Sequence, residues 1–122
     1  MIHGSVKEPL QNKTLIPNGL RTSNPWDRMR GLLGRKKLND KQGLWISPCP
    51  SVHTIGMRYP IDVIFMDRQG NVKKITHNLK PMKFSSCVGA YSVLELAEGL
   101  ATKLHITTGM SLRWETNKVN KV

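Results

Sequence analysis

The sequence predicts a mainly β fold, a β-rich α+β chain arranged as a compact β-barrel or sandwich with two short helices. Three observations lead to this prediction. Short apolar or alternating runs recur along the 122 residues, and turn residues separate them at close spacing. Only two short segments carry helical signals. A chain of this length can bury one hydrophobic core, so we expect a single folded domain.

The chain is expected to divide into three parts. Residues 1–12 should form a flexible N-terminal arm, residues 13–115 a single β-rich domain, and residues 116–122 a polar C-terminal tail. No repeat, low-complexity tract or long linker interrupts the sequence of the domain.

The clearest helical signal begins at Asn24. Its side chain can cap a helix, and Pro25 suits the first helical position. The apolar stripe that follows consists of Trp26, Met29, Leu32 and Leu33. Gly31 weakens such a helix, so packing must support it, and Gly34 is expected to end it.

The strands are predicted from apolar runs and the turns that flank them. Residues 61–66 are apolar on both faces apart from Asp62, as in a central strand that is covered on two sides. The turn residues 67–71 lead into an alternating segment, so that 61–66 and 72–77 should form a hairpin. The other expected strands are residues 13–16, 43–46, 91–97 and 110–114, and the second short helix should lie within 98–104.

The composition is strongly basic. The 19 Lys and Arg residues against 8 Asp and Glu give a formal net charge of +11, which attracts anionic partners in a salt-dependent way. We favour a solvated basic face that maintains solubility as the explanation of this charge, because no nucleic-acid-binding motif accompanies it. The densest basic patch comprises Arg28, Arg30, Arg35, Lys36, Lys37 and Lys41.

The two cysteines, Cys49 and Cys87, lie 38 positions apart. This spacing matches neither a structural zinc site nor a redox Cys-x-x-Cys pair. We expect two reduced, partly buried thiols in a reducing cytoplasm, and neither a metal nor a cofactor. A disulfide and a catalytic thiol are the alternatives.

The hydropathy pattern points to a soluble protein. No apolar run approaches the roughly 20 residues that a membrane-spanning helix needs. The first residues lack an apolar export segment. We therefore expect a cytoplasmic monomer without an integral membrane segment.

The candidate pocket residues are Cys49, His53, Thr54, Arg58, Asp62 and Glu95. Their spacing matches no metal-ligand, nucleophile or phosphate-loop motif that would identify a reaction. In one hypothesis a carboxylate orients the His53 imidazole in a pocket, where the imidazole acts as a base or a ligand. In the other, Asp62 ties a helix to the sheet through an arginine, and His53 is hydrogen-bonded in the core.

Two carboxylates occur within predicted strands. Alternation places Asp62 on an apolar face shared with Ile64 and Met66, where it must be paired or hydrogen-bonded. Its expected partners are Arg30, Arg35, Arg58 and His53. Glu95 should point away from its leucine neighbours, towards solvent or a second charge pair.

Several ordered motifs carry a family resemblance. They are Met29–Arg35, Ser51–Thr54 with Gly56–Arg58, Pro60–Asp62, Phe65–Asp67, and Val93–Leu96 with Gly99. Over about residues 14–115 they resemble the bacterial and archaeal family named domain of unknown function 192. The resemblance implies a small, mainly β domain with no established activity, cofactor or substrate. Other members often carry an export leader, which this sequence does not show, and Ala97–Glu98 departs from the usual proline before the glycine.

Three classes of function follow from these features. We expect a non-catalytic ligand-binding or accessory domain of uncharacterised role. One alternative is an interaction protein that binds an acidic partner or nucleic acid through the basic patch. The other is a small enzyme with His53 and Asp62 in acid–base roles and Cys49 as its nucleophile.

Overall fold

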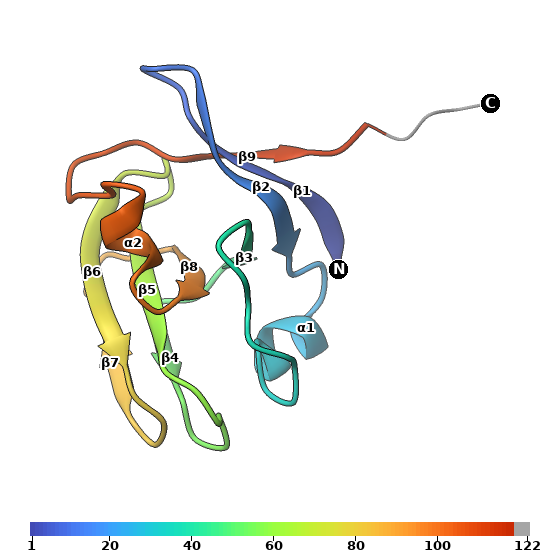
Figure 1. Cartoon of the computed structure of the whole chain (residues 1–122). Helices are drawn as coiled ribbons and strands as arrows, with labels where there is room; N and C mark the ends of the chain where they lie inside the picture. The colour runs from blue at the N-terminus through green and yellow to red at the C-terminus, as the bar shows by residue number, and fades with distance from the viewer. Residues whose placement is uncertain (119–122) are drawn as a thin grey trace.

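One seven-stranded sheet forms most of the fold in the computed structural model, which describes residues 1–118 (Figure 1). Its strands lie in the order β6 (Val72–Leu79), β5 (Ile61–Met66), β8 (Ser92–Ala97), β3 (Gln42–Ile46), β2 (Lys13–Arg21), β1 (Ile2–Glu8) and β9 (Arg113–Thr116). A second sheet pairs β4 (Ser51–His53) with β7 (Phe84–Ser86), and the helices are α1 (Pro25–Arg30) and α2 (Leu100–Lys103). The large sheet does not close on itself, so the fold is sandwich-like rather than a barrel.

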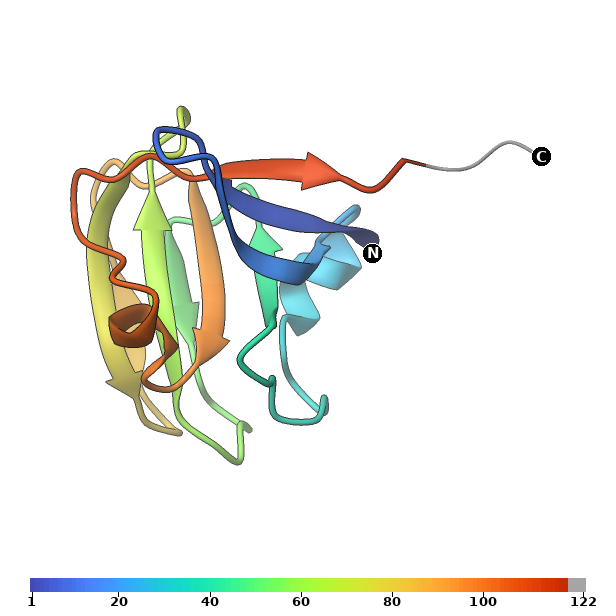
Figure 2. The ribbon, with the colours of Figure 1, turned by 45° about the horizontal axis from the view of Figure 1, so that its top comes forward.

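Both faces of the central strands β5 and β8 are buried, as their apolar sequences predict. On one face, Ile64 and Leu96 pack in a core cluster with Leu100 of α2. On the other face, Val63 belongs to a second cluster with Val52 of β4. Figure 2 shows α2 on the near side of these strands and the β4–β7 sheet on the far side.

The predicted hairpin of residues 61–66 and 72–77 is confirmed by the antiparallel ladder between β5 and β6. The turn between them is closed by Asp67, whose Oδ1 accepts hydrogen bonds from the N–H groups of Gln69 and Asn71, both at 2.9 Å. This is the turn chemistry that the side-chain oxygen of an aspartate provides.

The first twelve residues differ from the flexible arm that we expected. They contain β1, which pairs along one side with β2 and along the other with β9. Val6 is fully buried between these neighbours. The polar sequence of this segment gives no clear strand pattern, and the strands that pair with it lie elsewhere in the chain.

The C-terminal strand begins later than expected, at Arg113 rather than Met110. Thr116, assigned to the polar tail, still belongs to β9. Of the rest of the predicted tail, residues 119–122 lie outside the described residues. Among residues 1–118, no helix is long and apolar enough to cross a bilayer.

The helix after Asn24 begins as predicted but ends three residues early. Asn24 Oδ1 accepts a hydrogen bond from the Asp27 N–H at 2.9 Å, and Pro25 occupies the first helical position. The helix ends at Gly31, whose φ of 51° suits a residue without a Cβ. Trp26 and Met29 are consequently exposed, and the expected apolar stripe buries only Leu32.

Asp62 is buried in β5 and accepts two backbone hydrogen bonds. The register of the β5–β6 ladder shifts beside it, and the N–H of Asn78 from this irregular part of β6 donates to Asp62 Oδ1 at 2.9 Å. The N–H of Ala101, in the first turn of α2, donates to Asp62 Oδ2 at 3.0 Å. The residue that precedes α2 is Gly99, which has no capping side chain, so Asp62 supplies the acceptor from another element.

This arrangement corrects the expected partners of Asp62, because two backbone amides stand where an arginine or histidine was predicted. The hypothesis that Asp62 ties a helix to the sheet through an arginine is wrong about the partner, since Asp62 joins β5 to α2 through the Ala101 N–H. A short buried carboxylate can accept hydrogen bonds from backbone N–H groups that have no partner within a helix or sheet. When both of its oxygens accept such bonds, it needs no positively charged partner.

We expect Asp62→Ala to destabilise the fold by about 3 kcal/mol or more, since it removes two hydrogen bonds to a charged acceptor and leaves two N–H groups without one. Chemical denaturation monitored by circular dichroism measures this change. Asp40→Ala is the control, because Asp40 makes an exposed ion pair with Lys103 (3.0 Å) and its loss should cost less than about 1 kcal/mol. Equal losses in the two variants would contradict the anchoring role of Asp62.

Candidate functional site

A pocket of about 90 Å³ opens between α1, the segment that contains β4, and β8. Its charged and titratable lining residues are Arg28, Arg30, Cys49, His53 and Glu95. Its apolar lining residues are Met29, Leu32, Leu33, Ile46, Val52, Ile55 and Met57. Three candidates from the sequence, Cys49, His53 and Glu95, are therefore brought together here.

Glu95 reaches the pocket because of the strand register. It pairs with Val63 of β5 and with Leu44 of β3, and both neighbours belong to the core cluster on the α1 side of the sheet. As expected, its side chain points away from the adjacent leucines. It does not reach open solvent, since the residue is only 5% exposed.

The Glu95 carboxyl has none of the partners that usually accompany a buried acid. Within residues 1–118, every fully buried side-chain polar atom has a hydrogen-bond partner. Glu95 takes part in no side-chain hydrogen bond or ion pair of these residues, so its oxygens must open onto the pocket that it lines. Burial raises the pKa of Glu95 to about 7.

The backbone after α1 lies against this carboxyl. A Cβ added at Gly31 would stand in van der Waals contact with Glu95 Oε1, at 3.4 Å, so the helix end lies next to the acid. Leu32, the next residue, is buried in the same cluster as Val63. The end of α1 therefore forms one wall of the pocket.

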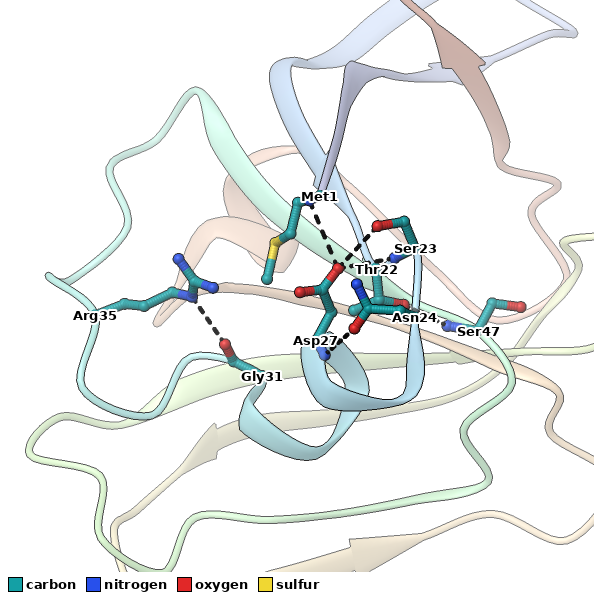
Figure 3. A network of polar contacts seen from close by, with 8 residues as sticks. All are labelled: Met1, Thr22, Ser23, Asn24, Asp27, Gly31, Arg35 and Ser47. Carbon is teal, nitrogen blue, oxygen red and sulfur yellow. Dashed lines mark hydrogen bonds and ion pairs between the residues drawn. The ribbon is translucent and has the colours of Figure 1, made fainter.

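Polar contacts at its two ends hold α1 in place, as Figure 3 shows. The N–H and Oγ of Ser23 donate to Asp27 Oδ2 at 3.0 and 2.9 Å, and the amino group of Met1 lies 3.6 Å from the same oxygen. The hydrogen bonds from Ser23 hold the pKa of Asp27 below its usual value. Beyond the helix, Arg35 Nε donates to the Gly31 carbonyl at 3.0 Å.

The two cationic side chains of the pocket come from this helix. Arg28 and Arg30 are exposed, whereas Glu95 is buried, so cations lie at the open side of the pocket and the acid lies at its inner side. His53 is also exposed, on β4, where it pairs with Phe84 of β7. His53 therefore does not have the core role that the second hypothesis gave it.

Cys49 is a neutral thiol in this setting. Its Sγ donates to the Ser51 carbonyl at 3.0 Å. Burial raises the pKa of Cys49 and the negative charge of Glu95 adds to this rise, while a backbone hydrogen bond at Ser51 and the positive charge of Arg28 oppose it in part. Both cysteines are free, and both are partly buried.

The other candidates lie elsewhere. Asp62 shares a face with Leu96, which belongs to the core cluster on the α2 side, so the sheet separates it from Glu95. Thr54 is buried, and its Oγ1 donates to the Lys80 carbonyl at 2.6 Å and accepts from the Lys83 N–H at 2.9 Å. It joins two loops and does not line the pocket.

Arg58 belongs to a second, larger groove of about 550 Å³ next to the pocket. This groove is also lined by Arg35, Lys36 and Lys37 of the basic patch, and it shares Leu32, Leu33 and Met57 with the pocket. Lys41 lines neither of the two. The basic patch and the candidate pocket, which the sequence suggests as separate features, therefore adjoin.

Sequence reasoning assigned Arg28 and Arg30 to a surface patch and did not connect them with Glu95. Local signals locate the start of α1 but carry no information about which strand its end approaches. The separation of Asp62 from Glu95 could have been inferred from alternation once the pairing of β5 with β8 was known. Within residues 1–118, no three His, Cys, Asp or Glu side chains cluster in a way that could hold a metal ion.

Comparison with known proteins places this fold among proteins of undefined function. A solved structure from Novosphingobium aromaticivorans DSM 12444, a protein of unknown function, has a TM-score of 0.73 and 25% identity, over 92% of this chain and 84% of that chain. A structure from Sinorhizobium meliloti 1021, described as a "putative transcription regulator", has a TM-score of 0.78 and 19% identity, over 93% of this chain and 92% of that chain. The second likeness concerns the fold alone. No curated protein matches the chain.

The family profile named DUF192, described as an uncharacterized ACR, matches residues 21–114. This segment extends from the end of β2 to β9 and includes every residue that lines the pocket. The chain belongs to the domain of unknown function 192 family.

Proposed function

We propose that this protein is a non-catalytic binding domain, in which the pocket beside α1 takes a small polar group of a ligand and Glu95 recognises that group. The observation that supports this proposal is a buried carboxyl that faces a pocket and has no protein partner within residues 1–118. A titratable group whose pKa is strongly perturbed in a cleft is a candidate recognition group. A ligand that bonds to Glu95 would recover the solvation that burial removes.

The chemistry of the pocket limits the ligand group. With a pKa of about 7, Glu95 can accept a hydrogen bond as a carboxylate or donate one as an acid near neutral pH. Arg28 and Arg30 both line the pocket, and Arg30 Nε also donates to the Leu33 carbonyl at 3.1 Å; their positive charges favour a ligand whose remaining part is anionic. We therefore propose a compact hydrogen-bond donor, such as a hydroxyl, amide or amine, on a ligand that also carries an acidic group.

The setting that we propose is the cytoplasm, with the protein as a monomer. Free Cys49 and Cys87 suit a reducing compartment.

The alternative of a small enzyme draws on Cys49 and His53, which line the same pocket. A nucleophilic cysteine requires a base or a positive field that favours its thiolate. Here the thiol donates to a carbonyl, and the positive charge of Arg28 lowers the pKa of Cys49 by less than burial and Glu95 raise it. These features favour binding over nucleophilic catalysis.

A set of probes of equal size tests the recognition role of Glu95. Propylamine, propionamide and propanol should each shift the backbone NMR signals of Gly31, Cys49 and Glu95 on titration, and propionate should shift only those of α1. Glu95→Gln should weaken the donor probes at least tenfold, since it removes a charge-assisted hydrogen bond. Glu98→Gln is the control, because Glu98 is exposed and pairs with Lys37 at 3.5 Å. Unchanged binding by Glu95→Gln would contradict the proposal.

The stability of the protein should depend on pH through Glu95. Its pKa is raised from 4.5 to about 7 by folding, so the folded state binds more protons than the unfolded state between these values. Stability from this group is fully present below pH 4.5 and is lost as the pH rises through 7, by up to about 3 kcal/mol. Urea denaturation at pH 5 and pH 8 measures the difference, which Glu95→Gln should reduce and Glu98→Gln should preserve.

The rate at which Cys49 reacts with a thiol reagent should depend on the effect of the Glu95 charge on the pKa of its thiol. In a Cys87→Ser background, Cys49 should react with a thiol reagent more slowly than an unfolded control peptide at pH 8, because its pKa is raised. Replacing Glu95 with Gln removes the negative charge and should accelerate the reaction several-fold. A rate in the native protein above that of the peptide would instead support the enzyme alternative.

A further inference from the structure

Three loops lie together at one end of the molecule. They are residues 31–37 after α1, residues 54–60 between β4 and β5, and residues 80–83 between β6 and β7, all at the bottom of Figures 1 and 2. Thr54 joins the second loop to the third through the Lys80 carbonyl and the Lys83 N–H. The first two loops touch, since a Cβ at Gly56 would lie 2.8 Å from Leu33 Cδ1. We call this surface the loop end.

The loop end is uniformly cationic. The three loops contain no Asp or Glu. Their cations are Arg35, Lys36, Lys37, Arg58, Lys80 and Lys83. Lys37 pairs with Glu98 at 3.5 Å, and Arg35 bonds to the Gly31 carbonyl. The side chains of Lys36, Arg58 and Lys83 form no hydrogen bond or ion pair within residues 1–118 and are exposed, which leaves their charges available to a partner.

Each loop also exposes an apolar side chain among these cations. Leu33 is 42% exposed, Ile55 57% and Met82 68%. The three belong to three different loops, and Leu33 and Ile55 both line the Glu95 pocket. Exposed apolar side chains among cations resemble the interfacial mode of membrane binding, in which apolar groups enter the lipid headgroup layer and cations remain at the phosphates.

The groove of about 550 Å³ between the first two loops provides a place for a phosphate. Arg35, Lys36 and Arg58 line it together with apolar Leu33 and Met57, and no acidic residue contributes. The lining therefore suits an anion that is attached to an apolar chain.

We propose that the loop end docks on an anionic lipid surface, with lipid phosphates in the groove and Leu33, Ile55 and Met82 in the interfacial layer. A nucleic acid would instead require aromatic faces on which bases could stack. The single aromatic residue of the three loops is Tyr59, whose hydroxyl donates to the Arg35 carbonyl at 3.1 Å. Leu33 and Ile55 also line the Glu95 pocket, but docking uses neither the Glu95 carboxyl nor a ligand bound to it.

Vesicle cosedimentation tests the electrostatic part of the proposal. The full chain should bind vesicles of phosphatidylglycerol and phosphatidylcholine, and should not bind vesicles of phosphatidylcholine alone. The triple variant Lys36→Gln, Arg58→Gln, Lys83→Gln should weaken binding about a hundredfold, since each cation near an anionic bilayer contributes roughly fivefold. The matched control is Lys13→Gln, Lys73→Gln, Arg113→Gln, three exposed cations at the starts of β2, β6 and β9, away from the loop end. An equal loss in the control variant would overturn the proposal in favour of net charge alone.

The apolar points separate a lipid surface from other polyanions. Ile55→Ser with Met82→Ser should weaken vesicle binding about tenfold, whereas Leu10→Ser, an exposed change in the distant β1–β2 turn, should leave it unchanged. No effect of the loop pair would overturn lipid docking and favour an acidic protein or a nucleic acid. Free glycerol phosphate is the last arm: if it binds the loop end as tightly as vesicles do, the source of the phosphate is a soluble ligand and the proposal is also overturned.

Discussion

The burial of β5 and β8 on both faces is the constraint on which the other features of this structure depend. Strands at the centre of a sheet have no solvent on either side, so any polar side chain in them must end in a hydrogen bond or in a cavity. One face is closed by α2 and the other by the β4–β7 sheet and the segment after α1. Leu100 of α2 covers the first face, and Val52 of β4 and Leu32, which follows α1, cover the second.

Two carboxylates occur in these strands, and they show the two outcomes that the constraint allows. Asp62 has a short side chain and two backbone amides within reach, so its charge is used entirely within the protein. Glu95 has a longer side chain, lies on the opposite face, and ends at a pocket where the protein offers it no partner within residues 1–118. Burial of this acid costs folding free energy that no bond within the described protein offsets. A role in ligand recognition would explain why the acid is present.

The pocket and the loop end are separate surfaces that share a boundary. Leu32, Leu33 and Met57 line both the Glu95 pocket and the cationic groove. The segment after α1 contributes to each: Gly31 contacts the Glu95 side, and Arg35 and Lys36 line the groove. A binding domain that docks on a surface would hold its pocket close to that surface, which gives the two proposals a common geometry.

Local sequence patterns are sufficient to predict the mainly β fold class, the hairpin of β5 and β6, and the start of α1, because each depends on apolar periodicity and on turn or capping residues. They also indicate that Asp62 must be satisfied and that Glu95 points away from its leucine neighbours, since both follow from strand alternation. The contacts of the folded chain were needed to show that β1 is paired, that amides rather than arginines bind Asp62, and that Arg28 and Arg30 line the pocket of Glu95. These contacts join segments that are far apart in the chain, and their geometry is set by strand order and register, which no local pattern of residues encodes.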